Sequence, residues 1–198
     1  MKWDERYRAG HYVYGVEPND FLREYVARLP PGGRVLCVAE GEGRNAVFLA
    51  RQGFAVTAVD ASAVGLSKGE RLARERRVSV DWVCADLASY DLGEERWDGV
   101  VSIFCHLPEA LRVDLHRRVV SSLRPQGVLL LEAYAPAQLG RGTGGPPDAA
   151  LLVSAAALER ELQGLSCELL REIERDVVEG TLHTGRGAVV QLIARRLR

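Results

Sequence analysis

The alternation of apolar runs with helical segments is the feature that most limits the fold of this chain. Five runs have the length and the unbroken apolar character of strands covered on both faces, at residues 34–39, 55–59, 79–84, 97–104 and 127–134. Helical patterns lie between these runs, at residues 44–52, 62–76 and 108–123. A βαβαβ…βαβ order predicts an α/β fold with a doubly wound, mostly parallel sheet.

The C-terminal part departs from this alternation. A glycine-rich loop at 140–147 precedes a predicted helix over 151–162. Two strand-like runs follow, at 167–179 and 186–197, and only residues 180–185 join them. So short a connection requires antiparallel pairing, because a parallel crossover needs a dozen or more residues. We therefore expect a seven-stranded sheet that ends in an antiparallel C-terminal hairpin.

Residues 1–31 precede the first predicted strand and are dense in aromatic side chains. Asn19 suits the N-cap of a helix over 20–29, which two prolines would end. This leader either packs over a layer of helices or forms a lid over the site. The chain has 198 residues, 47% of them hydrophobic, which favours one domain over 1–198 with a Rossmann-like core at 32–198.

Composition limits the classes of partner. The net charge of −1 gives no overall attraction to nucleic acid or to an anionic membrane. The N-terminus has no apolar signal region, and the most apolar window is shorter than the roughly 20 residues that span a bilayer. The cysteines lack CxxC spacing, so we expect reduced thiols, no metal site and a cytoplasmic location; they are Cys37, Cys84, Cys105 and Cys167.

The turn after the first predicted strand combines glycines with carboxylates. Residues 41–46 (GEGRNA) match the G-x-G-x-x-A pattern of dinucleotide sites, and Asp60 is placed to bind both ribose hydroxyls. However, Glu40 and Glu42 would stand near a diphosphate, and like charges 4 Å apart cost about 4 kcal/mol at an effective dielectric of 20. S-adenosyl-L-methionine, a cationic adenosine cofactor without phosphate, suits the turn better. Glu42 either contacts this cofactor or points to solvent.

At these motifs the sequence resembles the class I S-adenosylmethionine-dependent methyltransferases. Their glycine, acidic and later strand motifs are similar to VLCVAEGEGRN, AVTAVDAS, CADL, WDGVVSIFCHLP and LRPQGVLLLEAY. Within this family, three segments resemble the subgroup of tellurite-resistance and thiopurine methyltransferases. These segments are WDERYRAGHYVYGVEPNDFL, FCHLP and EGTLHTGRGAVVQLIARR. The resemblance implies methyl transfer to a small soft or oxyanionic nucleophile of sulfur, selenium or tellurium. The family usually has an acid at the position of Cys37 and a glycine at that of Ala39, so either Glu40 or backbone carbonyls would bind the cofactor ammonium here.

We predict the cofactor site at the carboxyl ends of the strands, where an open α/β sheet binds ligands. Tyr7 and Tyr14 either attract the sulfonium, by roughly 0.5–2 kcal/mol, or pack in the core. Arg44 either meets the cofactor carboxylate or lies on the surface, and Asp86 either contacts adenine or caps a turn. The full predicted set is Tyr7, Tyr14, Glu40, Gly41, Glu42, Gly43, Arg44, Asn45, Asp60, Ala61, Ser62, Asp86, Leu87 and Phe104.

Two histidines are candidates for acceptor chemistry. His106 follows the fourth predicted strand, and its pKa range suits a base or an orienting group; the alternative is a structural hydrogen bond or stacking near adenine. His183 and Arg186 in the hairpin turn form a candidate pair for an anionic acceptor, or else are exposed turn residues. The loop at 140–147 with Arg141 is a candidate lid over the acceptor.

Other reactive side chains receive structural interpretations. His116 lies among arginines in a predicted helix and is expected to face solvent. Cys105 and His106 would not form a nucleophile–base pair if the strand continues, because neighbours on a strand point to opposite faces.

Three functions are consistent with these features. The first is a methyltransferase that acts on a small-molecule acceptor, as a monomer or a homodimer, with no nucleic acid or membrane partner. The second is a non-catalytic protein that binds S-adenosylmethionine. The third is a nicotinamide oxidoreductase, which would need a second cofactor-binding half after the third strand.

Overall fold

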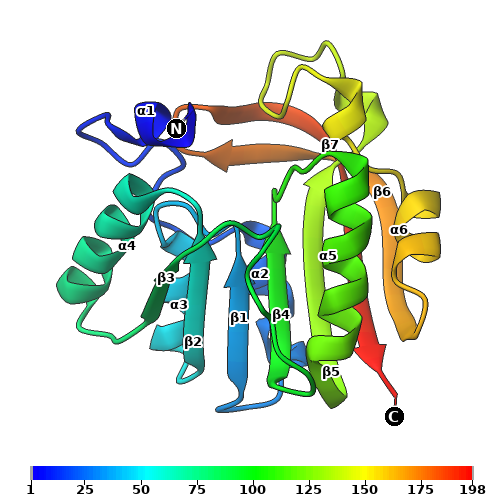
Figure 1. The fold of residues 1–198 in the computed structure, drawn as a ribbon. Helices are drawn as coiled ribbons and strands as arrows, with labels where there is room; N and C mark the ends of the chain where they lie inside the picture. The colour runs from blue at the N-terminus through cyan, green and yellow to red at the C-terminus, as the bar shows by residue number, and fades with distance from the viewer. Residues whose placement is uncertain (1, 198) are drawn as a thin grey trace.

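The computed structural model describes residues 2–197 and has the predicted α/β architecture (Figure 1). Its one seven-stranded sheet has the order β3-β2-β1-β4-β5-β7-β6. β1 to β5 are parallel, and β7 is antiparallel to both β5 and β6. The strands are β1 (Arg34–Val38), β2 (Ala55–Asp60), β3 (Asp81–Cys84), β4 (Trp97–Ile103), β5 (Leu123–Tyr134), β6 (Leu165–Glu179) and β7 (His183–Arg196).

Helices cover both faces of the sheet, as unbroken apolar strands require. One face packs against α5 (Glu109–Ser122) and α6 (Ala155–Glu161), and its core includes Leu36, Leu115 and Leu158. The other packs against α2 (Asp20–Tyr25) and α3 (Arg44–Arg51), with Val35, Phe21 and Leu49 in its core. α4 (Ala63–Arg76) lies beside α3. Neighbours on β1 supply both cores, because successive side chains on a strand point to opposite faces.

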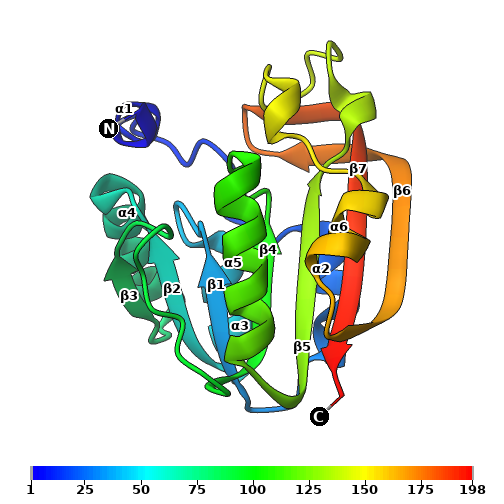
Figure 2. The same cartoon turned by 45° about the vertical axis from the view of Figure 1, so that its right-hand side comes forward.

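The hairpin of β6 and β7 bends across the carboxyl edge of the parallel strands, toward the N-terminal helix α1 (Lys2–Tyr7) (Figure 2). Its turn reaches the leader, where the Thr181 N–H donates to the Val13 carbonyl at 2.9 Å. The leader, the hairpin and the loop after β5 therefore surround the edge at which α/β sheets bind ligands. None of the helices within residues 2–197 combines the length and the apolar character needed to cross a membrane.

Several element boundaries differ from the sequence prediction. The helix expected over 151–162 begins only at Ala155, because Ser154 is its N-cap and Val153 donates a backbone bond to the Tyr134 carbonyl. The helix expected over 20–29 ends at Tyr25 and continues as a 3-10 turn, Val26–Arg28. β5 begins at Leu123, directly after α5, and not at residue 127. β7 begins at His183, so the hairpin turn is shorter than expected.

Candidate active site

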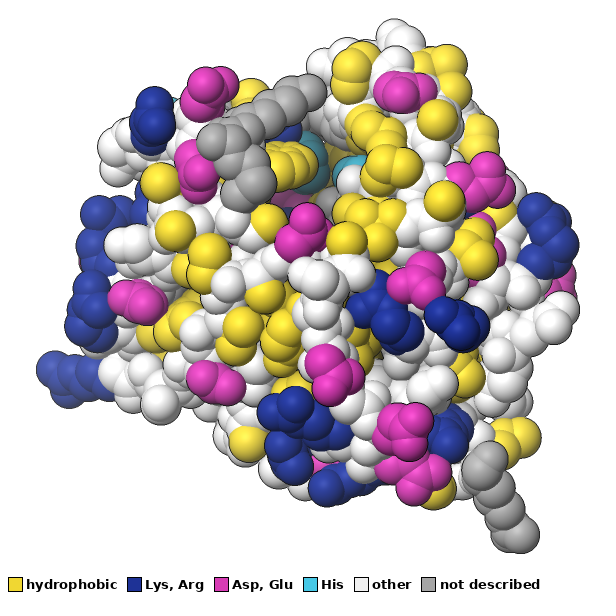
Figure 3. Space-filling model, in the orientation of Figure 1, with side chains coloured by type: hydrophobic (Ala, Val, Ile, Leu, Met, Phe, Trp, Pro, Cys, Tyr) yellow, Lys and Arg dark blue, Asp and Glu magenta, His cyan; other side chains and the backbone are white. Residues whose placement is uncertain are grey.

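A cavity of about 570 Å³ opens at the carboxyl edge of the sheet, within the range of about 300–1,000 Å³ that is usual for small-molecule sites. Figure 3 shows its mouth as a hollow in which histidine side chains are visible. The hollow lies where strand order reverses between β1 and β4. Fourteen of the predicted site residues line it: Tyr7, Tyr14, Glu40, Gly41, Glu42, Arg44, Asn45, Asp60, Ala61, Asp86, Leu87, Phe104, His106 and His183.

The two glycines of the turn after β1 have different roles. At Gly41, with φ of 64°, a Cβ would stand 2.6 Å from the Tyr7 hydroxyl, so the leader packs directly on this backbone. At Gly43, with φ of 89°, a Cβ would stand 2.6 Å from the Gly69 Cα and 2.7 Å from the Trp82 ring. Gly43 therefore permits close packing of α3 against α4, and it does not line the cavity as the cofactor prediction required.

Glu40 occupies the N-terminus of α3. Its Oε1 accepts hydrogen bonds from the backbone N–H groups of Asn45, at 2.9 Å, and Ala46, at 2.8 Å. Burial raises the pKa of Glu40 to about 7, although these bonds and the Arg44 guanidinium act in the opposite direction. The amides at a helix N-terminus are the donors that usually hold a phosphate. Because a carboxylate already takes them, this turn is poorly suited to a diphosphate.

Glu42 fastens the leader to the turn. Its Oε2 accepts from the backbone N–H groups of Val13, at 2.8 Å, and Tyr14, at 3.2 Å, and its Oε1 lies 2.5 Å from Lys68 Nζ. Lys68 also donates to three leader carbonyls, those of Tyr7, Ala9 and His11. With only 2% of its side chain exposed, Glu42 is not the solvated residue that one alternative expected. The leader thus packs on α4 and also lines the cavity.

Carboxylates follow β2 and β3 as well. Asp60 accepts from the Gly41 and Ser62 N–H groups, each at 2.8 Å, and burial raises its pKa. Asp86 caps a turn by accepting from the Ala88 N–H at 2.9 Å, and it also lines the cavity. Ser62 lies outside the lining, because it is the N-cap of α4 and its hydroxyl donates to Asp4 at 2.6 Å.

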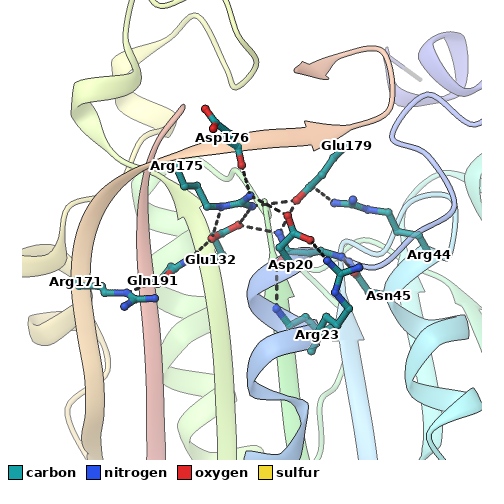
Figure 4. Close-up of polar contacts among 12 residues, drawn as sticks. Asp20, Arg23, Arg44, Asn45, Glu132, Arg171, Arg175, Asp176, Glu179 and Gln191 are labelled. Atoms are coloured by element: carbon teal, nitrogen blue, oxygen red, sulfur yellow. Dashed lines mark hydrogen bonds and ion pairs between the residues drawn. The ribbon is translucent and has the colours of Figure 1, made fainter. Parts of the chain in front are cut away.

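Arg44 is buried in an ionic network, so its interpretation as a surface residue is wrong (Figure 4). Its Nη2 donates to Glu179 Oε2 at 2.5 Å, while Nη1 has no hydrogen-bond partner among the described residues. Asn19 Nδ2 lies 2.8 Å from both Glu179 and Glu132, and Arg175 donates to the same two carboxylates. The network joins the leader, α3, β5 and β6, so it fixes Arg44 in the cavity wall.

Sequence reasoning missed this network. The one signal in the sequence was Glu132, an isolated acid inside the apolar run of β5. In the structure this side chain is fully buried. A buried carboxylate needs a cation or several donors. Its partner Arg175 comes from β6, beyond β7 in the sheet, and its position could be found only from the register of the β6–β7 hairpin.

Two neutral imidazoles line the opposite side of the cavity. His106 Nδ1 lies 3.3 Å from the Leu151 carbonyl; a carbonyl only accepts, so this nitrogen carries the hydrogen and Nε2 is an acceptor. Burial lowers the pKa of His106 to about 4. Burial also lowers the pKa of His183 to about 3, with Arg44, His106 and Arg6 adding to the effect and Glu179 opposing it. His106 Nε2 and His183 Nδ1 make no hydrogen bond within residues 2–197.

The predicted pairing of His183 with Arg186 is wrong. Arg186 is exposed, and its Nε donates to Glu174 at 3.1 Å, while His183 is buried and faces the cavity. Both residues lie on β7, where a separation of three places side chains on opposite faces. Arg141 pairs with the same Glu174 at 2.6 Å and lies outside the cavity lining, although residues 145–147 of its loop line it.

Two further interpretations need correction. His116 does not face solvent: it is buried, and its Nδ1 lies 2.7 Å from Glu161. β4 ends at Ile103, so Cys105 and His106 do not alternate as strand neighbours and both line the cavity. Burial nevertheless raises the pKa of the Cys105 thiol to about 12, which keeps it protonated and unsuited to nucleophilic attack.

Residues 35–127 match the family model of a methyltransferase domain. A similar fold occurs in a SAM-dependent methyltransferase from Methanosarcina mazei, with 16% identity, a TM-score of 0.72, and coverage of 91% of this chain and 99% of that one. TehB from Haemophilus influenzae has 15% identity and a TM-score of 0.72 over 89% of this chain and 61% of its own.

A third structure comes from work on the conversion of a disulfide bond into a thioacetal group during echinomycin biosynthesis. It is 22% identical, with a TM-score of 0.77 over 99% of this chain and 91% of its own. At such identities these likenesses establish the fold alone. No curated protein matches the sequence.

The cavity fits the cofactor that this domain implies. Asp60 ends β2, where a carboxylate can hold a ribose, and Glu40 offers a carboxylate to an ammonium. The unpartnered Nη1 of Arg44 suits a carboxylate ligand. The sheet described over residues 2–197 ends in an antiparallel pair where a dinucleotide fold would place its second half. Residues 35–127 therefore match a methyltransferase domain, and the cofactor that this domain implies is S-adenosyl-L-methionine.

Proposed function

We propose that this protein transfers a methyl group from S-adenosyl-L-methionine to a small-molecule acceptor with a soft nucleophilic atom, such as sulfur, selenium or tellurium. The observation that carries the proposal is the Glu40 carboxylate on the α3 amides, within a cavity that also holds Asp60 and two imidazoles, each with one ring nitrogen that makes no hydrogen bond to the described residues. This arrangement favours a cationic adenosine cofactor on one side and leaves room for a second molecule on the other.

Different lining residues bind different parts of the cofactor. We assign Asp60 to the ribose, Asp86 and Leu87 to the adenine, Glu40 to the ammonium and Arg44 to the carboxylate. When bound, the cofactor supplies an electrophilic methyl group on a sulfonium. Tyr7 and Tyr14 cover this region from the leader, with ring centroids 6.3 Å apart.

Positioning is the main contribution of the chain to catalysis. A good neutral leaving group needs little chemical assistance, and well-oriented reactants gain roughly 7–11 kcal/mol over a bimolecular encounter. The leader and residues 145–147 wall the cavity from opposite sides and would exclude water from the reacting atoms. Cofactor and acceptor would therefore meet in a confined space between Glu40 and His106.

A panel of acceptors tests the proposal. The purified protein should methylate at least one of a set of aliphatic and aromatic thiols, thiopurines, selenite and tellurite, detected by mass spectrometry of product and of S-adenosylhomocysteine. An Asp60→Asn variant should lose product in proportion to its weaker cofactor binding. If the protein binds the cofactor but leaves every acceptor unchanged, a non-catalytic binding function replaces the proposal.

A further inference from the structure

Two free imidazole nitrogens on the β4–β7 side of the cavity have no use in binding the cofactor. His106 Nε2 and His183 Nδ1 are shielded from solvent and make no hydrogen bond with any described residue. A buried polar atom without a partner costs about 1–3 kcal/mol. Because the His106 Nδ1 hydrogen points to the Leu151 carbonyl, Nε2 can only accept. The missing partner of His106 is therefore a hydrogen-bond donor.

Aromatic and apolar side chains surround these nitrogens. The Phe104 ring centroid lies 6.1 Å from that of His106, in a stacked arrangement, and 4.8 Å from that of His183. Leu151 and the prolines at 146 and 147 complete this part of the lining. We call Phe104, His106, Leu151 and His183 the acceptor subsite. Its side chains are apolar or uncharged, which suits a flat or compact uncharged molecule. The Tyr134 ring packs on both imidazoles, and its hydroxyl is likewise buried without a partner among the described residues.

Charge is distributed unevenly across the cavity. The carboxylates Glu40, Asp60 and Asp86 lie at or just after the ends of β1, β2 and β3. The two imidazoles lie just after β4 and at the start of β7, on the other side of the β1/β4 boundary. The cationic side chains that face His183 are already engaged: Arg6 donates to the Tyr14 hydroxyl at 2.9 Å, and Arg44 pairs with Glu179. The four residues of the subsite include no cationic side chain, so the subsite itself offers no ion pair to an oxyanion.

We propose that the acceptor subsite binds a neutral acceptor whose nucleophilic atom still carries its proton, and that His106 Nε2 accepts this proton during transfer. The inference rests on the proposed methyltransferase function and narrows its acceptor class. The bond between the nucleophilic atom and the methyl carbon forms as the carbon–sulfur bond breaks, and sulfur keeps that electron pair. The proton passes from the acceptor to His106, which later releases it to water. Charge is conserved, because one cation disappears as the imidazolium forms.

The low pKa of His106 determines when this proton can move, because a weakly basic ring accepts it only as the new methyl bond makes the proton on the nucleophile strongly acidic. A neutral imidazole is the form that can accept, and burial keeps His106 neutral throughout the physiological range. His183 is neutral for the same reason and is placed to orient the acceptor. An acceptor that arrives as an anion would gain nothing from His106, since the free lone pair of its Nε2 repels negative charge.

Matched acceptors provide the test. Benzyl mercaptan is neutral at pH 7, whereas 4-nitrothiophenol, selenite and tellurite are ionised. With S-adenosylhomocysteine bound, calorimetry should give at least about tenfold tighter binding of benzyl mercaptan than of the three ionised probes. In protein labelled with ¹⁵N in its histidine rings, benzyl mercaptan should shift the Nε2 resonance of His106. Neither readout requires turnover.

Two variants separate proton transfer from packing. His106→Phe keeps the ring and should slow methylation of benzyl mercaptan about 10²–10⁴-fold, while it changes 4-nitrothiophenol methylation less than about threefold. His106→Gln, whose side-chain oxygen can accept, should restore part of the loss. Tighter binding of an oxyanion, or equal loss for both thiols, would overturn the inference. If the wild-type protein did not bind S-adenosylhomocysteine at all, the proposed methyltransferase function itself would be refuted.

Discussion

Replacing Glu40 with Gln should stabilise the protein above neutral pH and weaken its binding of the cofactor. Burial raises the pKa of Glu40 from its ordinary value of 4.5 to about 7. The folded state therefore holds this proton more tightly than the unfolded state, and ionisation destabilises the fold as pH rises from 4.5 through 7. The Gln amide oxygen can accept the same bonds from Asn45 and Ala46 without a buried charge.

The size of the effect follows from these two pKa values. Linkage gives a destabilisation by Glu40 of about 0.8 kcal/mol at pH 5 and about 3 kcal/mol at pH 8. Glu40→Gln should thus raise the free energy of unfolding by about 3 kcal/mol at pH 8 and by little at pH 5. Each kcal/mol corresponds to about 2–4 °C in Tm for a domain of this length.

Urea denaturation of the cofactor-free protein at pH 5 and pH 8 measures this difference. The exposed Glu24→Gln substitution on α2 is the matched control and should leave stability unchanged at both pH values. Calorimetry at pH 8 should also show that Glu40→Gln binds S-adenosylhomocysteine at least about tenfold more weakly, since a charge-assisted bond is worth about 1.5–3 kcal/mol. Destabilisation of equal size at both pH values would refute the reasoning, because the carboxylate would then be a favourable helix cap.

Three other substitutions test other parts of the site. Asp60→Ala should weaken S-adenosylhomocysteine binding about 100-fold in calorimetry, because two bonds to a charged acceptor are lost; unchanged affinity would assign the ribose to another residue. Gly43→Ala should lower the free energy of unfolding by about 2–5 kcal/mol in urea denaturation, because a Cβ at φ of 89° meets the Gly69 backbone; a loss below about 1 kcal/mol would contradict the packing role. Lys68→Met should speed amide hydrogen exchange at Val13 and Tyr14, since Lys68 neutralises the Glu42 that holds them; unchanged protection would show that the leader is held elsewhere.

The sheet could be predicted because the parallel strands are largely apolar runs separated by turn residues and helical patterns. The start of α6 could not, because residues 149–158 are apolar enough to read as one helix. The helix begins after Val153 because the backbone N–H of this residue donates a hydrogen bond to the Tyr134 carbonyl at the end of β5. Tertiary hydrogen bonding overrode the local helical pattern at this position.

Within the site, the positions of the carboxylates were predictable but their partners were not. Glu40 and Glu42 were placed in the turn from the sequence, on the argument that their charge excludes a phosphate. In the structure, Glu40 excludes it by occupying the α3 amides, and Glu42 is neutralised by Lys68 and fastens the leader. The partners of Glu42 lie far from the turn in the chain, so only the folded arrangement of α4 and the leader reveals them.

Calorimetric titration with S-adenosylhomocysteine and, separately, with NADH tests the central claim most directly. We predict binding of one S-adenosylhomocysteine per chain with a micromolar or lower Kd, no heat of binding with NADH, and weakened binding in Asp60→Ala. The absence of S-adenosylhomocysteine binding at high micromolar concentration, or binding of NADH in its place, would contradict the account.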